Sequence, residues 1–248
     1  MNYVMSDLHG AYKRYLWMLR TLNINFDKDV LIINGDVLDR NPGSLKLFMD
    51  LYKTQEKFGV DHIKILKGNH ELFLSKYLKG ELKESLYSAF GGEKTISEVK
   101  KLSVSERTRL VEIIDSLPLY LKVYSEKRGE DILITHTGPL QHALDSFSES
   151  DIIDISDAVK KSVEYDEYKH LINQYIQCEA PAWVRRNIDC TLMVGHVPTY
   201  RVVETQGPSI IVEMPGKKVI LTDCGAGYPQ LGGRLGCIRI EDEAVFYA

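Results

Sequence analysis

The sequence lacks the features that mark secreted, membrane-spanning and disulfide-stabilised proteins. It contains only four cysteines among 248 residues, and none of them forms a C-x-x-C pair. Asp7 follows the first residues too closely for the apolar core of a secretory signal. No apolar run approaches the roughly 18 residues that cross a bilayer. We therefore expect a cytoplasmic protein that binds no membrane and whose cysteines are reduced and mostly buried.

An excess of positive charge is also missing. The formal net charge is -4, and no stripe of Lys and Arg dominates any segment, so no specific nucleic-acid binding is expected. Hydrophobic residues make up 44% of the chain, which is enough for a sizeable core. The length fits one large α/β domain or two small ones, and without a repeat or a low-complexity linker we expect a single domain over residues 1–248. The oligomeric state stays open.

Short polar clusters follow several apolar runs that are typical of buried strands. The predicted strands are Tyr3–Met5, Val30–Ile33, Ile63–Leu66, Ile132–Ile134 and Leu192–Val194. The clusters after them are Asp7-Leu8-His9-Gly10, Gly35-Asp36-Val37-Leu38-Asp39-Arg40, Gly68-Asn69-His70-Glu71, Thr135-His136 and Gly195-His196. In open α/β sheets, ligands bind just beyond the carboxyl ends of the strands. If these strands lie side by side, the clusters therefore converge on one rim.

The first part of the chain alternates strands with helices. Residues Tyr12–Leu22 and Ser44–Phe58 carry apolar side chains at helical spacing, which predicts a parallel sheet with right-handed crossovers. Residues 72–117 have a helical, charged pattern that is broken by Gly91 and Gly92. A pair of strands at 119–123 and 131–135 is expected after them.

The second half of the chain has a different sequence pattern. The segment from about 140 to 180 is acidic at first and then helical with interleaved Tyr residues. We interpret it as an inserted helical cap or specificity region, and a plain surface helix with a solvated acidic face is an equal alternative. After Thr191 we predict short antiparallel strands in a second sheet that packs on the first. They are expected at 201–204, 209–212, 218–221, 235–240 and 244–247.

The predicted rim gathers side chains that bind divalent metals. Asp7 and His9 lie two residues apart and can hold one metal together with Asp36, whose two carboxylate oxygens allow it to bridge two ions. A second metal is assigned to Asp36, Asn69, His136 and His196. Two metals about 3.5–4 Å apart can share a water and lower its pKa toward neutrality. The bridging hydroxide is then the expected nucleophile.

The remaining residues of the clusters complete a hydrolytic site. His70 follows Asn69 directly and so leaves the backbone on another side, where it can protonate a leaving oxygen. Asp39 is its expected orienting partner, and Arg40 offers a planar fork for two phosphoryl oxygens. Each element alone is weak, because Asp-x-His occurs by chance and Gly-Asn-His is commonly a turn. All the clusters together, each at a strand end, indicate phosphate-ester hydrolysis.

The same residues resemble a known family. The clusters are similar to those of the calcineurin-like metallophosphoesterases, and more narrowly to the small bacterial and phage branch of the phosphoprotein phosphatases. The resemblance spans Asp7 to about Cys237. It implies an α/β fold, a four-layer α-β-β-α sandwich with mixed sheets. It also implies two divalent metal ions, with Mn²⁺ first and Fe or Zn as alternatives, and it matches the roles given above.

The resemblance adds one residue and shows two departures. Trp183-Val184-Arg185 resembles the Trp-x-Arg element of the family, which implies a phosphate-binding role for Arg185. Wider relatives, including nucleases, often carry Gly-His-x-His, whereas here Gly195-His196 is followed by Val197-Pro198, and this favours the phosphoprotein phosphatase branch. Lys67 stands where many relatives have Arg, and a Lys has no bidentate fork for phosphate.

The expected activity is that of a metal-dependent Ser/Thr protein phosphatase acting on a phosphorylated protein or a small phosphoester. The alternative is a symmetrical diadenosine tetraphosphate hydrolase or a related nucleotide phosphohydrolase with the same core. Glu71 leans toward the phosphatase, because the symmetrical hydrolases tend to carry Asp at that position. A degenerate fold that only binds phosphorylated partners is a third interpretation, and the intact set of ligands argues against it.

Overall fold

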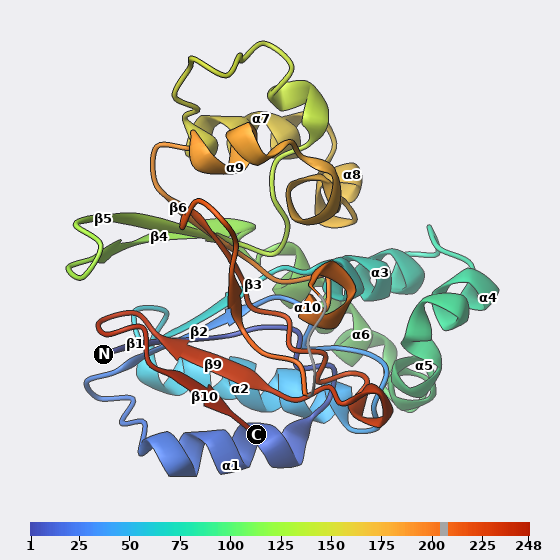
Figure 1. Cartoon of the computed structure of the whole chain (residues 1–248). Helices are drawn as coiled ribbons and strands as arrows, with labels where there is room; N and C mark the ends of the chain where they lie inside the picture. Colours follow the sequence, from blue (N-terminus) through green and yellow to red (C-terminus); the bar gives the residue numbers. More distant parts are fainter. Residues whose placement is uncertain (204–207) are drawn as a thin grey trace.

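The computed structural model describes residues 1–203 and 208–248. Two five-stranded sheets lie face to face, and helices cover the outer face of each (Figure 1). The predicted four-layer α-β-β-α arrangement is therefore confirmed. The first sheet contains β1 (Asn2–Met5), β2 (Val30–Asn34), β3 (Ile63–Leu66), β9 (Gly236–Arg239) and β10 (Val245–Tyr247). The second contains β4 (Tyr120–Ser125), β5 (Glu130–Thr135), β6 (Thr191–Val194), β7 (Val212–Glu213) and β8 (Val219–Leu221).

Both sheets are mixed. The first has the order β10-β9-β1-β2-β3, with β1, β2 and β3 parallel and β9 antiparallel to β1. The second has the order β4-β5-β6-β8-β7, with β5, β6 and β8 parallel. The strands that precede the polar clusters are thus divided between two sheets. Their carboxyl ends nevertheless point to the same end of the molecule, beside α3 and α10 in Figure 1.

Helices pack with the first sheet in a shared apolar core. They are α1 (Tyr12–Leu22), α2 (Ser44–Phe58), α3 (Asn69–Leu78), α4 (Glu84–Tyr87), α5 (Glu93–Val99) and α6 (Val104–Asp115), with a π-helical turn at Ser88–Gly92. The bounds of α1 and α2 are the predicted ones. Asn23 ends α1 in the left-handed region at φ 49°, and Gly59 ends α2 at φ 93°. Such caps stop a helix because few residues adopt these angles without strain.

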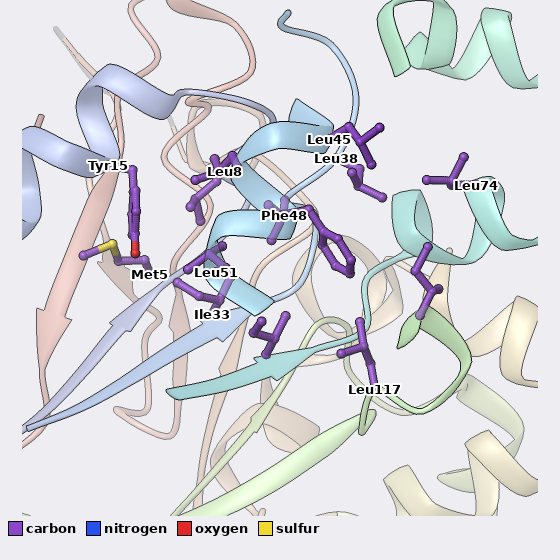
Figure 2. Close-up of a cluster of buried hydrophobic side chains, with 14 of the residues drawn as sticks. Met5, Leu8, Tyr15, Ile33, Leu38, Leu45, Phe48, Leu51, Leu74 and Leu117 are labelled. Carbon is purple, nitrogen blue, oxygen red and sulfur yellow. The ribbon is translucent and has the colours of Figure 1, made fainter. Parts of the chain in front are cut away.

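The core beneath these helices joins them to the sheet (Figure 2). Phe48 and Leu51 from α2 pack with Ile33 of β2, and Tyr15 from α1 packs beside Met5 of β1. Successive side chains of a strand point to opposite faces. The intervening residues of the same strands therefore face the other sheet, where Val4 and Ile32 meet residues of β5, β6 and β8 in a separate apolar layer. This double burial explains why the strands are apolar throughout.

The segment from 140 to 180 lies on the outer face of the second sheet. It contains α7 (Ile155–Tyr165), α8 (Glu167–Leu171) and a turn at Tyr175–Glu179, and α9 (Ala182–Arg186) follows. Ile155 and Val159 from α7 pack in one cluster with Leu133 and Leu192 of the sheet. Asp154 begins α7 by accepting a hydrogen bond from the amide of Asp157. The segment thus forms the fourth layer, with its acidic part at a helix start.

The C-terminal strands differ from the prediction in two ways. They do not form one sheet, because β7 and β8 extend the second sheet whereas β9 and β10 extend the first. The strand expected at 201–204 is wrong: Arg201 and Val202 belong to the short helix α10 (Thr199–Val202), and residue 204 lies outside the described residues. Of 209–212, only Val212 is in a strand, β7.

The state and burial of the cysteines agree with the expectation from the sequence. All four cysteines are free, and Cys190, Cys224 and Cys237 are buried. Over residues 1–203 and 208–248, none of the helices has the length and apolar character needed to cross a bilayer.

Candidate metal centre

The polar clusters meet where strands of both sheets end. Asp7 and Gly35, from neighbouring strands of the first sheet, are joined by a bond from the Asp7 amide to the Gly35 carbonyl at 3.1 Å. The Asn34 amide side chain crosses to the second sheet and donates to the Thr135 carbonyl at 3.0 Å. Within the second sheet, the amide of Gly195 donates to the carbonyl of His136 at 3.0 Å. The longest of these separations, between Asn34 and Thr135, is 101 positions.

The backbone at this meeting point is held in an unusual conformation. The residues at positive φ include Asp7 (54°), His9 (43°), Asp36 (52°), Asp39 (72°), Arg40 (65°) and His196 (68°). A non-glycine residue in this region costs roughly 1–2 kcal/mol. Bonds between loops offset the cost, because the amides of His9 and Gly10 donate to the carbonyls of Asp36 and Val37, both at 2.9 Å. Strain of this kind collects at functional sites.

Asp36 is at the centre of the cluster. Its Oδ2 lies 3.7 Å from His9 Nε2, 3.8 Å from His70 Nε2 and 3.4 Å from His136 Nε2. Its Oδ1 accepts a hydrogen bond from the His70 amide at 3.0 Å. Two triads of possible ligands result: His9, Asp36 and His70 form one, and Asp36, His136 and His196 form the other. They share Asp36, which is the arrangement expected of a bridging carboxylate.

The other predicted ligands surround this carboxylate. Asn69 Oδ1 lies 3.0 Å from His136 Nε2 and 2.8 Å from His196 Nδ1. Both oxygens of Asp7 accept from the His196 amide at 3.1 Å, and one also accepts from the Ser6 hydroxyl. All six predicted metal ligands are therefore brought together.

Hydrogen bonds at the Nδ1 atoms orient two of the imidazoles. His9 Nδ1 bonds to the Leu38 carbonyl at 2.8 Å, which leaves Nε2 turned to the cluster. His136 Nδ1 likewise bonds to the Asn34 carbonyl at 3.0 Å. A ring nitrogen bonded to a carbonyl is the usual support for a metal-ligating histidine, because it fixes the tautomer and the ring.

The electrostatics also fit divalent cations. Burial and the neighbouring Asp223 raise the pKa of Asp7 well above its usual value, and burial raises the pKa of Asp223 to about 6. Burial opposes the charge on His136, but the Asp36 and Asp7 carboxylates outweigh it and raise its pKa to about 10. The protein alone thus carries buried carboxylates that lack enough positive charge, and bound cations would supply it. Burial and His136 lower the pKa of His196 to about 3.

His70 is held by a short chain of hydrogen bonds. Its Nδ1 donates to Asp39 Oδ2 at 2.7 Å, and the Tyr87 hydroxyl donates to Asp39 Oδ1 at 2.6 Å. Asp39 is fully buried, so both bonds are shielded from water. The chain directs His70 Nε2 toward the cluster. This geometry suits a general acid, although the same nitrogen also belongs to one of the metal-binding triads.

The two arginines singled out in the sequence lie in different places. Arg40 Nε donates to His9 Nε2 at 3.1 Å, Nη2 lies 3.2 Å from His70 Nε2, and Nη1 bonds to the Tyr228 hydroxyl. Arg185 lies on α9, and the hydrogen bond found for its side chain within the described residues goes to the Ile176 carbonyl at 3.3 Å. The structure brings Arg40 to the cluster but does not place Arg185 in contact with it.

Lys67 also points away from the cluster. Its Nζ donates to Glu167 Oε1 at 3.0 Å and to the Asp115 carbonyl at 3.3 Å. These partners belong to α8 and α6, so Lys67 links helices. In this chain, the Lys that stands where many relatives have Arg therefore connects α6 and α8.

Glu71 has a structural role that its sequence position did not reveal. Its two oxygens accept from the amides of Asp36 (2.8 Å), Val37 (2.9 Å), Leu38 (3.1 Å) and Gly68 (2.9 Å). It is fully buried, and burial together with Asp36 raises its pKa. An acid three residues after the cap residue, accepting from the Gly68 amide, is one half of the capping-box pattern, and this spacing was the available signal. Sequence reasoning also missed Asp223 and Tyr228.

Comparisons with known proteins identify similar chains. The family profile described as calcineurin-like phosphoesterase matches residues 3–222. The chain is 30% identical over 176 residues to bis(5'-nucleosyl)-tetraphosphatase PrpE (asymmetrical) of Bacillus velezensis, covering 66% of this chain and 64% of that protein. It is 31% identical over 139 residues to the symmetrical bis(5'-nucleosyl)-tetraphosphatase of Buchnera aphidicola, covering 55% and 44%. The match therefore spans less than two thirds of either relative.

Solved structures share the fold at low identity. One provisionally assigned as a diadenosine tetraphosphatase has a TM-score of 0.59 at 16% identity and covers 100% of this chain and 92% of that chain. A protein serine/threonine phosphatase from Saccharomyces cerevisiae has a TM-score of 0.58 at 14% identity and covers 100% and 78%. Fold comparison alone thus does not distinguish the two expected activities. The named sequence relatives favour the alternative, a tetraphosphatase, over the protein phosphatase.

Replacing Glu71 should destabilise the whole protein. In Glu71→Ala, four buried amides lose their acceptor, and we expect the free energy of unfolding to fall by about 3 kcal/mol or more. Urea denaturation measures this loss. Glu126→Ala, at an exposed site, is the control and should stay within about 0.5 kcal/mol of wild type. An equal stability of the two variants would contradict the role given to Glu71.

Replacing Asp36 should weaken both metal positions at once. An amide is a poorer ligand than a carboxylate, so in Asp36→Asn we expect metal affinity to fall by more than about 100-fold. Metal content after dialysis, measured by mass spectrometry, should drop for both ions. Asp145→Asn, at an exposed site, serves as the control. An unchanged metal content in Asp36→Asn would exclude the bridging role.

Proposed function

The chain belongs to the calcineurin-like phosphoesterase family, and we propose that it hydrolyses dinucleoside polyphosphates such as diadenosine tetraphosphate. The sharing of Asp36 by two triads of possible ligands supports the two-metal chemistry. The names of the sequence relatives supply the substrate class, since symmetrical and asymmetrical bis(5'-nucleosyl)-tetraphosphatases both match this chain.

We assign the metal ligands as the sequence suggested. Asp7, His9 and Asp36 would hold one divalent cation, and Asp36, Asn69, His136 and His196 would hold the other, with manganese as the first choice. Such a pair of cations activates water for attack and stabilises charge on the phosphoryl oxygens. The rest of the chemistry belongs to the side chains around them.

His70 supplies the proton to the leaving oxygen. Asp39 holds its Nδ1, and Tyr87 holds Asp39, so the imidazole cannot rotate without breaking a buried bond. The Nε2 atom lies 3.2 Å from Arg40 Nη2. Arg40 binds the phosphoryl oxygens with its guanidinium. In a dinucleoside polyphosphate the leaving group is a nucleotide phosphate, which departs more readily than an alkyl oxygen.

A protein phosphatase remains the second candidate. The residue that favoured it is Glu71, but in the structure its carboxylate is fully buried and binds backbone amides of two loops. Glu71 therefore supports the construction of the site and gives no direct preference for a substrate. Arg185, the residue expected to provide a second phosphate contact, is bonded elsewhere. The names of the sequence relatives favour a dinucleotide substrate over a phosphoprotein.

The decisive experiment compares two substrates. The metal-free protein, reconstituted with Mn²⁺, is given diadenosine tetraphosphate and a phosphoserine peptide, and the products are separated by chromatography. We expect kcat/KM for the dinucleotide to exceed that for the peptide at least tenfold. Two ADP molecules identify symmetrical cleavage, and ATP with AMP identifies asymmetrical cleavage. Phosphate release from the peptide alone would replace this proposal with the protein phosphatase.

Loss of the proposed acid should slow the reaction without emptying the site. In His70→Asn we expect kcat to fall by about 10²–10⁴-fold on a phosphomonoester with a poor leaving group, as for other general acids. Metal content is measured on the same sample. If metal is lost together with activity, His70 is a ligand, as its place in one triad allows. Near wild-type turnover would reject both roles.

A further inference from the structure

A small cavity opens beside the candidate metal centre. Its volume is about 120 Å³, which holds roughly four water molecules. His9 and His196 form its inner wall, and Arg40, Arg201 and Tyr228 also line it. The cavity therefore gives access to two of the proposed metal ligands. Arg201 was not singled out in the sequence, where residues 201–204 were expected to form a strand.

Two guanidinium groups lie against one aromatic ring in this cavity. The Arg40 guanidinium carbon is 4.5 Å from the centroid of Tyr228, and that of Arg201 is 5.9 Å from the same centroid. An aromatic face attracts cations within about 6 Å. Tyr228 thus holds two like charges near each other at the entrance, which favours an anion that contacts both.

The two arginines are placed at different depths. Arg40 is half-buried and bonded to His9, so it faces the phosphoryl group that reacts. Arg201 is exposed and comes from α10, just after His196. Asp223 also lines the cavity and would repel an anion from its own side, while its Oδ1 accepts from the Gly225 amide at 2.7 Å. The outer anion is therefore expected on the arginine side.

We propose that Arg201, next to Tyr228, forms a second phosphate subsite that binds the phosphate adjacent to the one being cleaved. This proposal rests on the proposed function, because only a substrate with a phosphate chain fills both positions. A phosphomonoester or phosphopeptide carries one phosphoryl group and leaves Arg201 without a partner. Arg201 thereby selects polyphosphates over monoesters.

The test compares substrates that differ in the number of phosphates. Arg201→Gln removes the charge, and Arg201→Lys keeps it without the planar fork. We expect kcat/KM for diadenosine tetraphosphate to fall about 10–100-fold in Arg201→Gln, chiefly through KM, and less in Arg201→Lys. Turnover of p-nitrophenyl phosphate should stay within about twofold of wild type. Arg20→Gln, an exposed substitution on α1, is the control and should change neither.

A binding measurement keeps the subsite testable if the dinucleotide proves not to be a substrate. Calorimetry on the Mn²⁺-loaded protein gives dissociation constants for ADP, with two phosphates, and AMP, with one. We expect Arg201→Gln to raise the constant for ADP at least tenfold and to leave that for AMP nearly unchanged. Equal effects on ADP and AMP, or on both kinds of substrate, would overturn the subsite. No effect on any of them would overturn it as well.

Discussion

The site depends on the burial of a single carboxylate, Asp36, among imidazoles from three separate segments. A carboxylate buried at this depth is costly unless it is neutralised. The three nearest ring nitrogens stand 3.4–3.8 Å from Asp36 Oδ2, too far for good hydrogen bonds. The imidazole nitrogens and the carboxylate oxygen therefore surround a space that suits metal ions. The raised pKa values of the neighbouring Asp7 and Asp223 reflect the same shortage of positive charge around buried carboxylates.

A second carboxylate, Glu71, makes this arrangement possible without entering the site. By accepting from the amides of Asp36 and Val37 and from that of Gly68, it fixes two loops relative to each other. The left-handed backbone at Asp36 would otherwise relax. The two acids thus have different roles. Asp36 lies among the proposed metal ligands, and Glu71 holds the backbone that positions Asp36.

Much of this could be predicted because local patterns coincide with the fold. Helices α1 and α2 begin and end where their apolar spacing does, and all the polar clusters do follow strands. The sequence could not show that these strands are divided between two sheets, because both sheets demand the same apolar pattern. It also could not show that Lys67 bonds to helices α6 and α8, since side-chain direction depends on neighbours such as Glu167. Residues 201–202 form a helix despite a pattern that suits a strand.

The division of the strands has a consequence for the sandwich as a whole. The proposed ligands before Leu72 extend from the first sheet, and His136 and His196 extend from the second. Any ion bound by both sets ties the two halves of the molecule together at one end, while the apolar layer joins them along their length. Ion occupancy and the cohesion of the two sheets are then thermodynamically linked. A chelator would act on such a protein as a denaturant as well as an inhibitor.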